Sequence, residues 1–183
     1  MLRALRQWRQ RRVLETHAIP EALWRDALES LPFLAIYRDD ELARLRDKVV
    51  LFLDAKSVVG ARGHVVTPRQ RVVIALQACV LVLNLDLAYY DGWENIVVYP
   101  DEFVPGWQWE DEAGVVHAQD EPLAGEAMPN GPVILSWADV EASQERGILD
   151  ALEAGQRCAH AVRAVSLAVA LVADGADHLD DAG

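Results

Sequence analysis

The chain of 183 residues is 52% hydrophobic and carries a formal net charge of −12, from 29 acidic and 17 basic residues. This length and composition suit one globular domain with a core of its own. The acidic balance argues against nucleic acid and against a membrane as partners, because phosphate groups are bound by clustered lysine and arginine.

The first segment, MLRALRQWRQRR, is basic and departs from this balance. It could lie on a membrane surface as an amphipathic helix, but a solvated terminal helix is favoured, since anionic lipid would repel the rest of the chain. Residues 1–18 lack the apolar core and cleavage site of a secretory signal. The two cysteines, Cys79 and Cys158, are far apart and form no C-x2-C spacing. We therefore expect a cytoplasmic protein.

Two amphipathic helices are predicted next. The first follows Pro20, and its apolar residues recur at helical spacing at Leu23, Trp24, Ala27, Leu28 and Leu31. The second starts at a cap formed by Asp39 or Asp40. Its apolar stripe consists of Leu42, Leu45, Val49, Phe52 and Leu53. The following segment, VGARGHVVTP, is predicted to be a loop with one short extended piece.

A third helix is predicted to start with Thr67 as its N-cap and Pro68 at its first helical position. Its apolar run from Val72 to Tyr90 is about as long as a bilayer span, but Gln77, Asn84 and Asp86 interrupt it. An acidic residue within a span costs about 3 kcal/mol, so the run predicts a helix buried in a protein core. We expect Cys79 to lie in that core.

Short runs rich in β-branched residues follow, and each is bounded by turn residues. NIVVYP, GVVHAQ and GPVILSW are predicted to be strands, and the acidic segment between the first two carries Trp107 and Trp109. The expected fold class is α+β, with a helical N-terminal half packed on a small sheet of about three strands.

The last part of the chain differs in composition. It is rich in alanine and has no aromatic residue after Trp137, which predicts a helical tail over residues 156–183. We therefore divide the chain into a domain of residues 1–155 and a divergent tail of residues 156–183.

Catalytic motifs are sparse in this sequence. No H-E-x-x-H is present, and the five histidines, each expected to be structural or exposed, are His17, His64, His117, His160 and His178. Ser136 stands in no G-x-S-x-G elbow, and Cys158 lacks the local signatures of thiol proteases. A solvated acidic face explains the many carboxylates, among them Asp101, Glu102, Glu110, Asp111, Glu112 and Glu126.

Two longer segments carry a family resemblance: RVVIALQACVLVLNLDLAYYDGWENIVVYPDEF and DEAGVVHAQDEPLAGEAMPNGPVILSWADV. They closely resemble the zinc-dependent peptidases of the Mlc titration factor A family, and the similarity extends over residues 14–155. The resemblance implies a zincin-like fold and a cytosolic metallopeptidase of aminopeptidase type. It also implies a protein partner, since the founding member binds the glucose-responsive repressor Mlc. In the family, two histidines of an H-E-x-x-H helix bind zinc, its glutamate is the general base, and a downstream glutamate is the third protein ligand.

The chain departs from the family where that helix should begin. The sequence QRCAHAVRA holds His160, but Ala161 and Ala164 stand where the base and the second histidine would be. We therefore assign no catalytic, cofactor-binding or metal-binding residue, and expect a truncated, inactive chain that binds no zinc. A shift of reading frame near residue 156 would explain the tail. A short paralogue that keeps a binding role without catalysis is the alternative.

Overall fold

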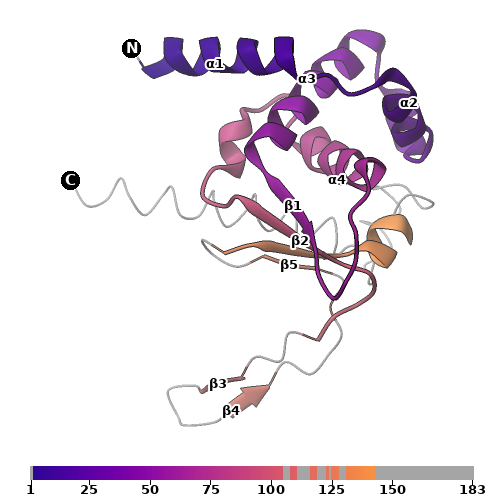
Figure 1. Cartoon of the computed structure of the whole chain (residues 1–183), viewed down its shortest axis with the longest axis vertical. Helices are drawn as coiled ribbons and strands as arrows, with labels where there is room; N and C mark the ends of the chain where they lie inside the picture. Colours follow the sequence, from indigo (N-terminus) through magenta and orange to yellow (C-terminus); the bar gives the residue numbers. More distant parts are fainter. Residues whose placement is uncertain are drawn as a thin grey trace.

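The computed structural model describes residues 2–104, 108–110, 116–118, 123, 125–127 and 131–142, and it confirms the α+β class (Figure 1). The α-helices precede most of the strands; they are α1 (Leu2–Thr16), α2 (Glu21–Glu29), α3 (Asp39–Ala55) and α4 (Pro68–Leu81). Two 3-10 helices lie beside them, η1 (Pro32–Ile36) and η2 (Leu87–Tyr90).

The main sheet has the strand order β1-β2-β6-β5. Three of its strands are parallel, β1 (Ser57–Gly60), β2 (Asn95–Tyr99) and β6 (Val133–Ser136), whereas the edge strand β5 (Gly125–Ala127) runs antiparallel to β6. A separate antiparallel pair is formed by β3 (Gln108–Glu110) and β4 (Val116–Ala118).

The strand prediction was therefore only partly correct. The three predicted runs are seen as β2, β4 and β6, but β4 pairs with β3 and not with the main sheet. The strands β1, β3 and β5 were not predicted. β1 shares only Val59 and Gly60 with the loop predicted over residues 59–68, and here it is a full member of the main sheet.

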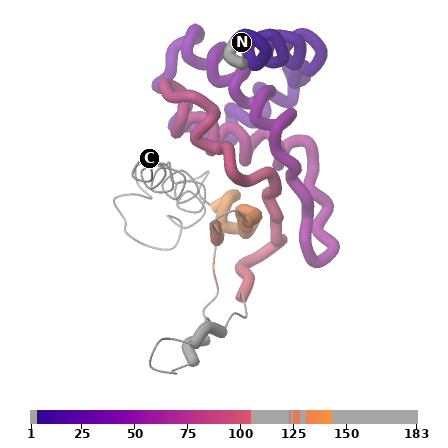
Figure 2. The backbone as a smooth tube through the Cα atoms, turned by 90° about the vertical axis from the view of Figure 1, so that its left-hand side faces the viewer, coloured from indigo at the N-terminus to yellow at the C-terminus, as the bar shows by residue number. Residues whose placement is uncertain are grey.

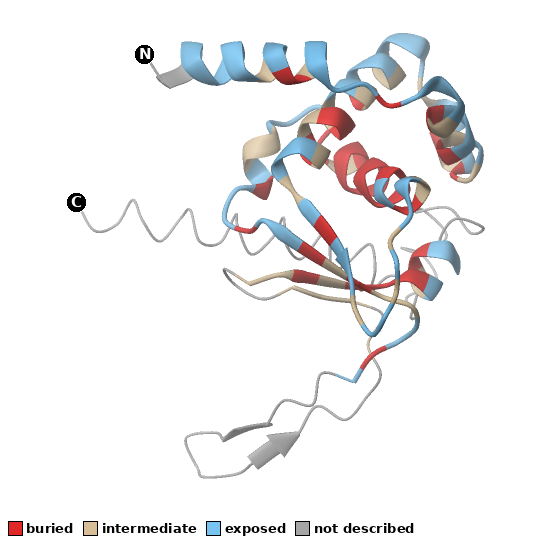
Figure 3. Cartoon of the chain, viewed as in Figure 1, coloured by how far each residue is buried: buried red, intermediate tan, exposed pale blue. Residues whose placement is uncertain are grey.

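The core lies between α3, α4 and one face of the sheet (Figure 3). On that face the register aligns the side chains of Val58, Ile96 and Val133 in one row, and all three are buried. Alternate residues point away from this core, as the two-residue period of a strand requires. α4 is buried along most of its length, and Cys79 lies in the core as predicted.

The helix boundaries test the capping predictions. Thr67 does cap α4, since its hydroxyl accepts a hydrogen bond from the N–H of Gln70 at 3.2 Å, and Pro68 is the first helical residue. The prediction of a cap at Asp39 or Asp40 was wrong: Arg38 is the N-cap of α3, and both aspartates lie in the first turn. There their carboxylates face the positive end of the helix dipole, which is a stabilising position.

The predicted helix from Val72 to Tyr90 is shorter in the structure. α4 ends at Leu81, and the chain turns before η2. The separate helix η2 begins after Asp86, because the carboxylate of Asp86 caps it by accepting a hydrogen bond from the N–H of Ala88 at 2.9 Å. In the described part of the chain, no helix has both the length and the apolarity to cross a membrane.

The basic first segment forms α1, which is mostly exposed as predicted. α1 packs against α3, at the far end of the helical layer from β5 and β6 (Figure 2). Val13 is buried and Leu14 half-buried, so the helix is attached to the body mainly through its C-terminal half.

Candidate functional site

The described histidines occupy separate elements. His17 follows α1, is exposed, and places Nδ1 2.9 Å from the hydroxyl oxygen of Thr16. His64 is half-buried in the turn after β1, and His117 pairs in register with Trp109 in the β3-β4 pair. His160, His178 and Cys158 lie outside the described residues. Within the described ranges, no three side chains of His, Cys, Asp or Glu gather as a metal ion would require.

Ser136 has a structural role at the end of β6. It is fully buried, and its hydroxyl oxygen accepts a hydrogen bond from the N–H of Asp139 at 3.3 Å, which is N-cap geometry for the helical residues 137–142. Asp101 and Glu102 are exposed beyond the end of β2, in agreement with a solvated acidic face. Glu110 and Glu126 belong to β3 and β5, and Asp111 and Glu112 lie outside the described residues.

A lysine at the end of α3 makes both hydrogen bonds and a cation–π contact. Lys56 follows α3, and its ammonium group donates hydrogen bonds to the backbone carbonyls of Tyr90 and Trp93. The ammonium nitrogen also lies 4.1 Å from the centre of the Trp93 ring. Burial lowers the pKa of Lys56, and the carboxylates of Asp91 and Glu94 oppose that shift. The lysine thereby joins the end of α3 to the segment that leads into β2.

A cavity of about 380 Å³ opens beside Lys56, between α1, α3 and η2. Its lining carries both signs of charge: α1 contributes Arg6 and Arg9, and the other walls contribute Asp54 and Asp91. Among its lining residues no nucleophile is paired with a general base, so the cavity offers charge and hydrogen bonds but no assembled catalytic group. Sequence reasoning missed this cavity because its walls come from segments far apart in the chain.

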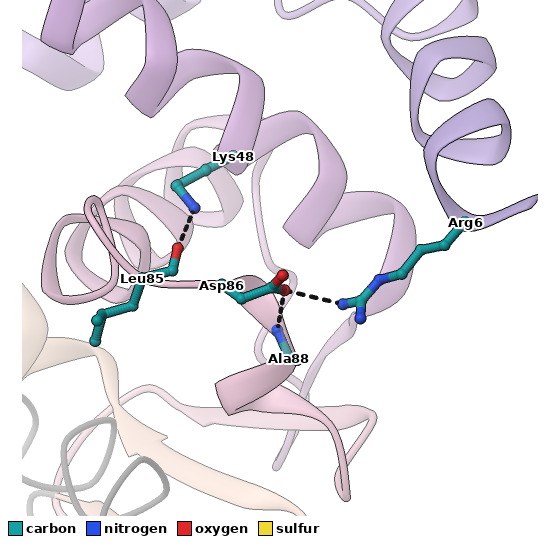
Figure 4. Close-up of polar contacts among 5 residues, drawn as sticks. All are labelled: Arg6, Lys48, Leu85, Asp86 and Ala88. Carbon is teal, nitrogen blue, oxygen red and sulfur yellow. Dashed lines mark hydrogen bonds and ion pairs between the residues drawn. The ribbon is translucent and has the colours of Figure 1, made fainter. Parts of the chain in front are cut away.

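An ion pair between Arg6, which lines this cavity, and Asp86 connects α1 to the turn before η2 (Figure 4). The guanidinium of Arg6 lies 3.1 Å from the carboxylate of Asp86, and both side chains are largely exposed. Lys48 supports the same turn by donating to the carbonyl of Leu85 at 2.7 Å. An exposed ion pair of this kind contributes about 0–1 kcal/mol. The packing of Val13 therefore holds α1 at least as strongly as the ion pair does.

The alkaline stability of the chain is expected to depend on Cys79. Burial raises the pKa of the Cys79 thiol above its ordinary value of about 9, although Lys48 opposes the shift. The folded state thus keeps this proton where the unfolded state releases it. The contribution of this thiol to the free energy of unfolding is fully present below about pH 9. It is lost as the pH rises toward the folded-state pKa, by up to about 1.4 kcal/mol per pH unit.

The variant Cys79→Ala tests this dependence. We expect its free energy of unfolding, measured by urea denaturation at a series of pH values, to fall less steeply above about pH 9. Part of the pH dependence remains in both proteins, because burial also raises the pKa of the Tyr90 hydroxyl. Equal slopes in variant and wild type would contradict the prediction.

The family follows from comparison with known proteins. Residues 5–148 match the family described as glucose-regulated metallo-peptidase M90. The chain belongs to this family. The resemblance found in the sequence is therefore confirmed, and the helical layer and the main sheet described above are the M90 part of the chain.

Three relatives of the M90 chain share the name Mlc titration factor A. The protein of Klebsiella pneumoniae (strain 342) is 36% identical over 123 residues, which are 67% of this chain and 46% of the relative. That of Enterobacter sp. (strain 638) is 36% identical over 126 residues, 68% of this chain and 47% of the relative. That of Salmonella gallinarum is 33% identical over 136 residues, which are 74% of this chain and 50% of the relative. The chain thus spans about half the length of these relatives.

Membership of a metallo-peptidase family supports the expectation of zinc in the family. The M90 match ends near residue 148, before the segment that holds His160. The Lys56 site and its cavity lie within the matched range but were not predicted. Their only sequence signal is a lysine placed directly between an amphipathic helix and a β-branched run, a position where its stem can be buried.

Proposed function

We propose that this chain is a member of the M90 family that lacks zinc peptidase activity as its sequence stands. One observation carries the proposal: no histidine of the sequence is followed by glutamate and a second histidine at H-E-x-x-H spacing. A zinc peptidase needs these groups together, because three protein ligands hold the metal and a carboxylate activates its bound water.

The segment around His160 supports this reading. A single imidazole binds zinc weakly, and Ala161 and Ala164 supply neither a base nor a second ligand. The aminopeptidase-type hydrolysis that the resemblance implies is therefore not assigned to this sequence. Residues 1–155 are proposed to be the part shared with the relatives of the family, and residues 156–183 a divergent tail.

Two origins of the tail remain as rival proposals. A shifted reading frame near residue 156 is supported by the change to a composition of Ala, Val, Arg, Asp and Gly without aromatic residues. A paralogue that has lost catalysis and keeps a binding role is the other. Sequencing the gene distinguishes them, because an intact H-E-x-x-H in another frame just after codon 155 supports the shift, and its absence rules the shift out.

The zinc content of the purified chain is the measurement that tests the proposed function. We expect far less than one zinc per chain by elemental analysis, and no chelator-sensitive hydrolysis of a chromogenic aminoacyl substrate. Urea unfolding of the same preparation serves as the control that the protein is folded. About one zinc per folded chain together with chelator-sensitive turnover would overturn the proposal, since a ligand set outside H-E-x-x-H would then exist.

A protein-binding role is the second candidate. The name of the relatives, Mlc titration factor A, supports an interaction between those proteins and Mlc, and the chain shares their matched half. We propose that this half contacts a protein partner such as a transcriptional repressor. A cytoplasmic location is proposed with it, supported by the free, buried thiol of Cys79, which suits a reducing compartment.

A further inference from the structure

The helix α1 presents a face that points away from the rest of the protein. Leu5, Trp8 and Arg12 are three, four and seven residues apart and lie on one side of the helix, and Arg9, four residues after Leu5, lies at the border between this side and the cavity. All four are exposed, with Leu5 at 62% and Trp8 at 58% of their maximal accessible surface. Arg6, Gln10 and Val13 lie toward the body and line the cavity, which Arg9 also reaches from the border, and Val13 is part of the core. We call the four exposed residues the outer face of α1.

The outer face combines apolar surface with positive charge. The guanidinium of Arg12 stacks 5.7 Å above the centre of the Trp8 ring, one helical turn away. Tryptophan and arginine are the side chains that contribute most to protein interfaces, because each can bury a large area and still make a polar contact. Leu5 and Trp8 are exposed in the free chain, so burying them against a partner would remove apolar surface from water.

The charge of α1 is opposite to that of the body. Its 15 residues hold five arginines and one glutamate, a net charge of +4, so the remainder of the chain carries −16. A nucleic acid or an anionic membrane presents an extended array of phosphates, which the body would repel. A short acidic protein segment presents only a few carboxylates, which can be confined to α1. Its apolar side chains can also cover Leu5 and Trp8.

We propose that the outer face of α1 is a docking surface for an acidic amphipathic helix of a partner protein. Apolar side chains of the partner pack on Leu5 and Trp8, and its carboxylates pair with Arg9 and Arg12. Pairing with α1 of a second copy is disfavoured, because it would bring two sets of arginines together. The inference deepens the protein-binding role proposed above and rests on it for the existence of a partner.

A synthetic probe tests the docking surface on the whole chain. The probe is a fluorescent helical peptide of leucine and glutamate, with leucine at every third or fourth position, and its counterpart carries lysine in place of glutamate. We expect fluorescence anisotropy to show binding of the glutamate peptide only, with an affinity that falls as salt is added. The double variant Leu5→Ala with Trp8→Ala should weaken binding by about tenfold or more.

Charge reversal and matched controls complete the test. Arg9→Glu with Arg12→Glu is expected to abolish binding, whereas Arg44→Glu, an exposed arginine on α3, should leave it unchanged. Ile36→Ala, which removes an apolar side chain that is 76% exposed, is the apolar control. Circular dichroism should show the same helix content in all variants.

Three outcomes would overturn the docking surface: no binding of the glutamate peptide, equal binding by the outer-face variants, or self-association in sedimentation that these variants abolish. The last outcome would assign the face to a contact between copies. Zinc content is independent of all three. A zinc-loaded chain would therefore refute the proposed loss of catalysis and leave the docking surface standing.

Discussion

Replacing Phe52 by alanine is expected to lower the free energy of unfolding by about 3–5 kcal/mol. Phe52 is 2% exposed and lies on α3, where the helical layer meets the segment that leads into β2. Its ring meets those of Tyr90 and Trp93 edge to face, with centroid distances of 5.5 and 6.1 Å. Alanine would remove both contacts and leave a cavity. The neighbouring rings cannot easily move to fill it, because Lys56 donates to the Tyr90 carbonyl and the Tyr90 hydroxyl donates to the Ala78 carbonyl.

Urea denaturation followed by tryptophan fluorescence measures this loss. The urea concentration at the midpoint of unfolding should fall. The dependence of the unfolding free energy on urea concentration should stay the same, since the folded state keeps its compactness. Ile36→Ala is the matched control, because Ile36 is 76% exposed and its removal should change stability by no more than about 0.5 kcal/mol. A loss below about 1 kcal/mol for Phe52→Ala would show that the three rings do not form a packed cluster.

The helices were predictable because their signals are local. The apolar stripe of α3 places Leu45, Val49 and Phe52 on one face, and these residues are buried in the structure. Thr67 and Pro68 likewise mark the start of α4 through contacts within a single turn. The cap of α3 could not be read in the same way, because Glu41 accepts the hydrogen bond of the Arg38 N–H, and aspartates one and two residues later look equally suited to that position.

The sheet was harder to predict because its pairing is not local. β2 and β6 are rich in β-branched residues and were recognised, but β5 has the sequence GEA and no such residue. β1 is four residues long, and its partner β2 follows only after α4 and η2. Parallel strands require such long connections, so a short strand is identified by its partner more than by its own composition.

The polar sites show the same limit. Lys56 bonds to carbonyls 34 and 37 residues later in the chain, and Arg6 pairs with Asp86 across 80 residues. No local pattern encodes these contacts. The family resemblance lay in runs of sequence and was confirmed, whereas the interpretation of His160 remains a prediction that falls outside the described residues.

At Gly60, the addition of a single methyl group is expected to lower the free energy of unfolding strongly. Gly60 ends β1, and the next four residues turn back on the strand: the N–H of His64 donates to the carbonyl of Ala61 at 2.9 Å, and Arg62 and Gly63 have φ values of 50° and 79°. A Cβ on Gly60 would lie 1.7 Å from the carbonyl oxygen of His64. That oxygen belongs to the backbone, so the turn would have to move away from the strand.

Gly60→Ala is therefore expected to destabilise the chain by about 3 kcal/mol or more, at the upper end of the cost of overpacking. The displacement would also strain the bond at 2.8 Å from the Ala61 N–H to the Val98 carbonyl, which continues the pairing of β1 with β2. Gly63→Ala is the matched control. Its new Cβ would meet no atom within 4 Å, and only the positive φ would disfavour alanine, at a cost of about 1 kcal/mol. Urea denaturation of both variants compares steric and conformational costs directly, and a smaller loss for Gly60→Ala than for Gly63→Ala would contradict the close approach of the turn to β1.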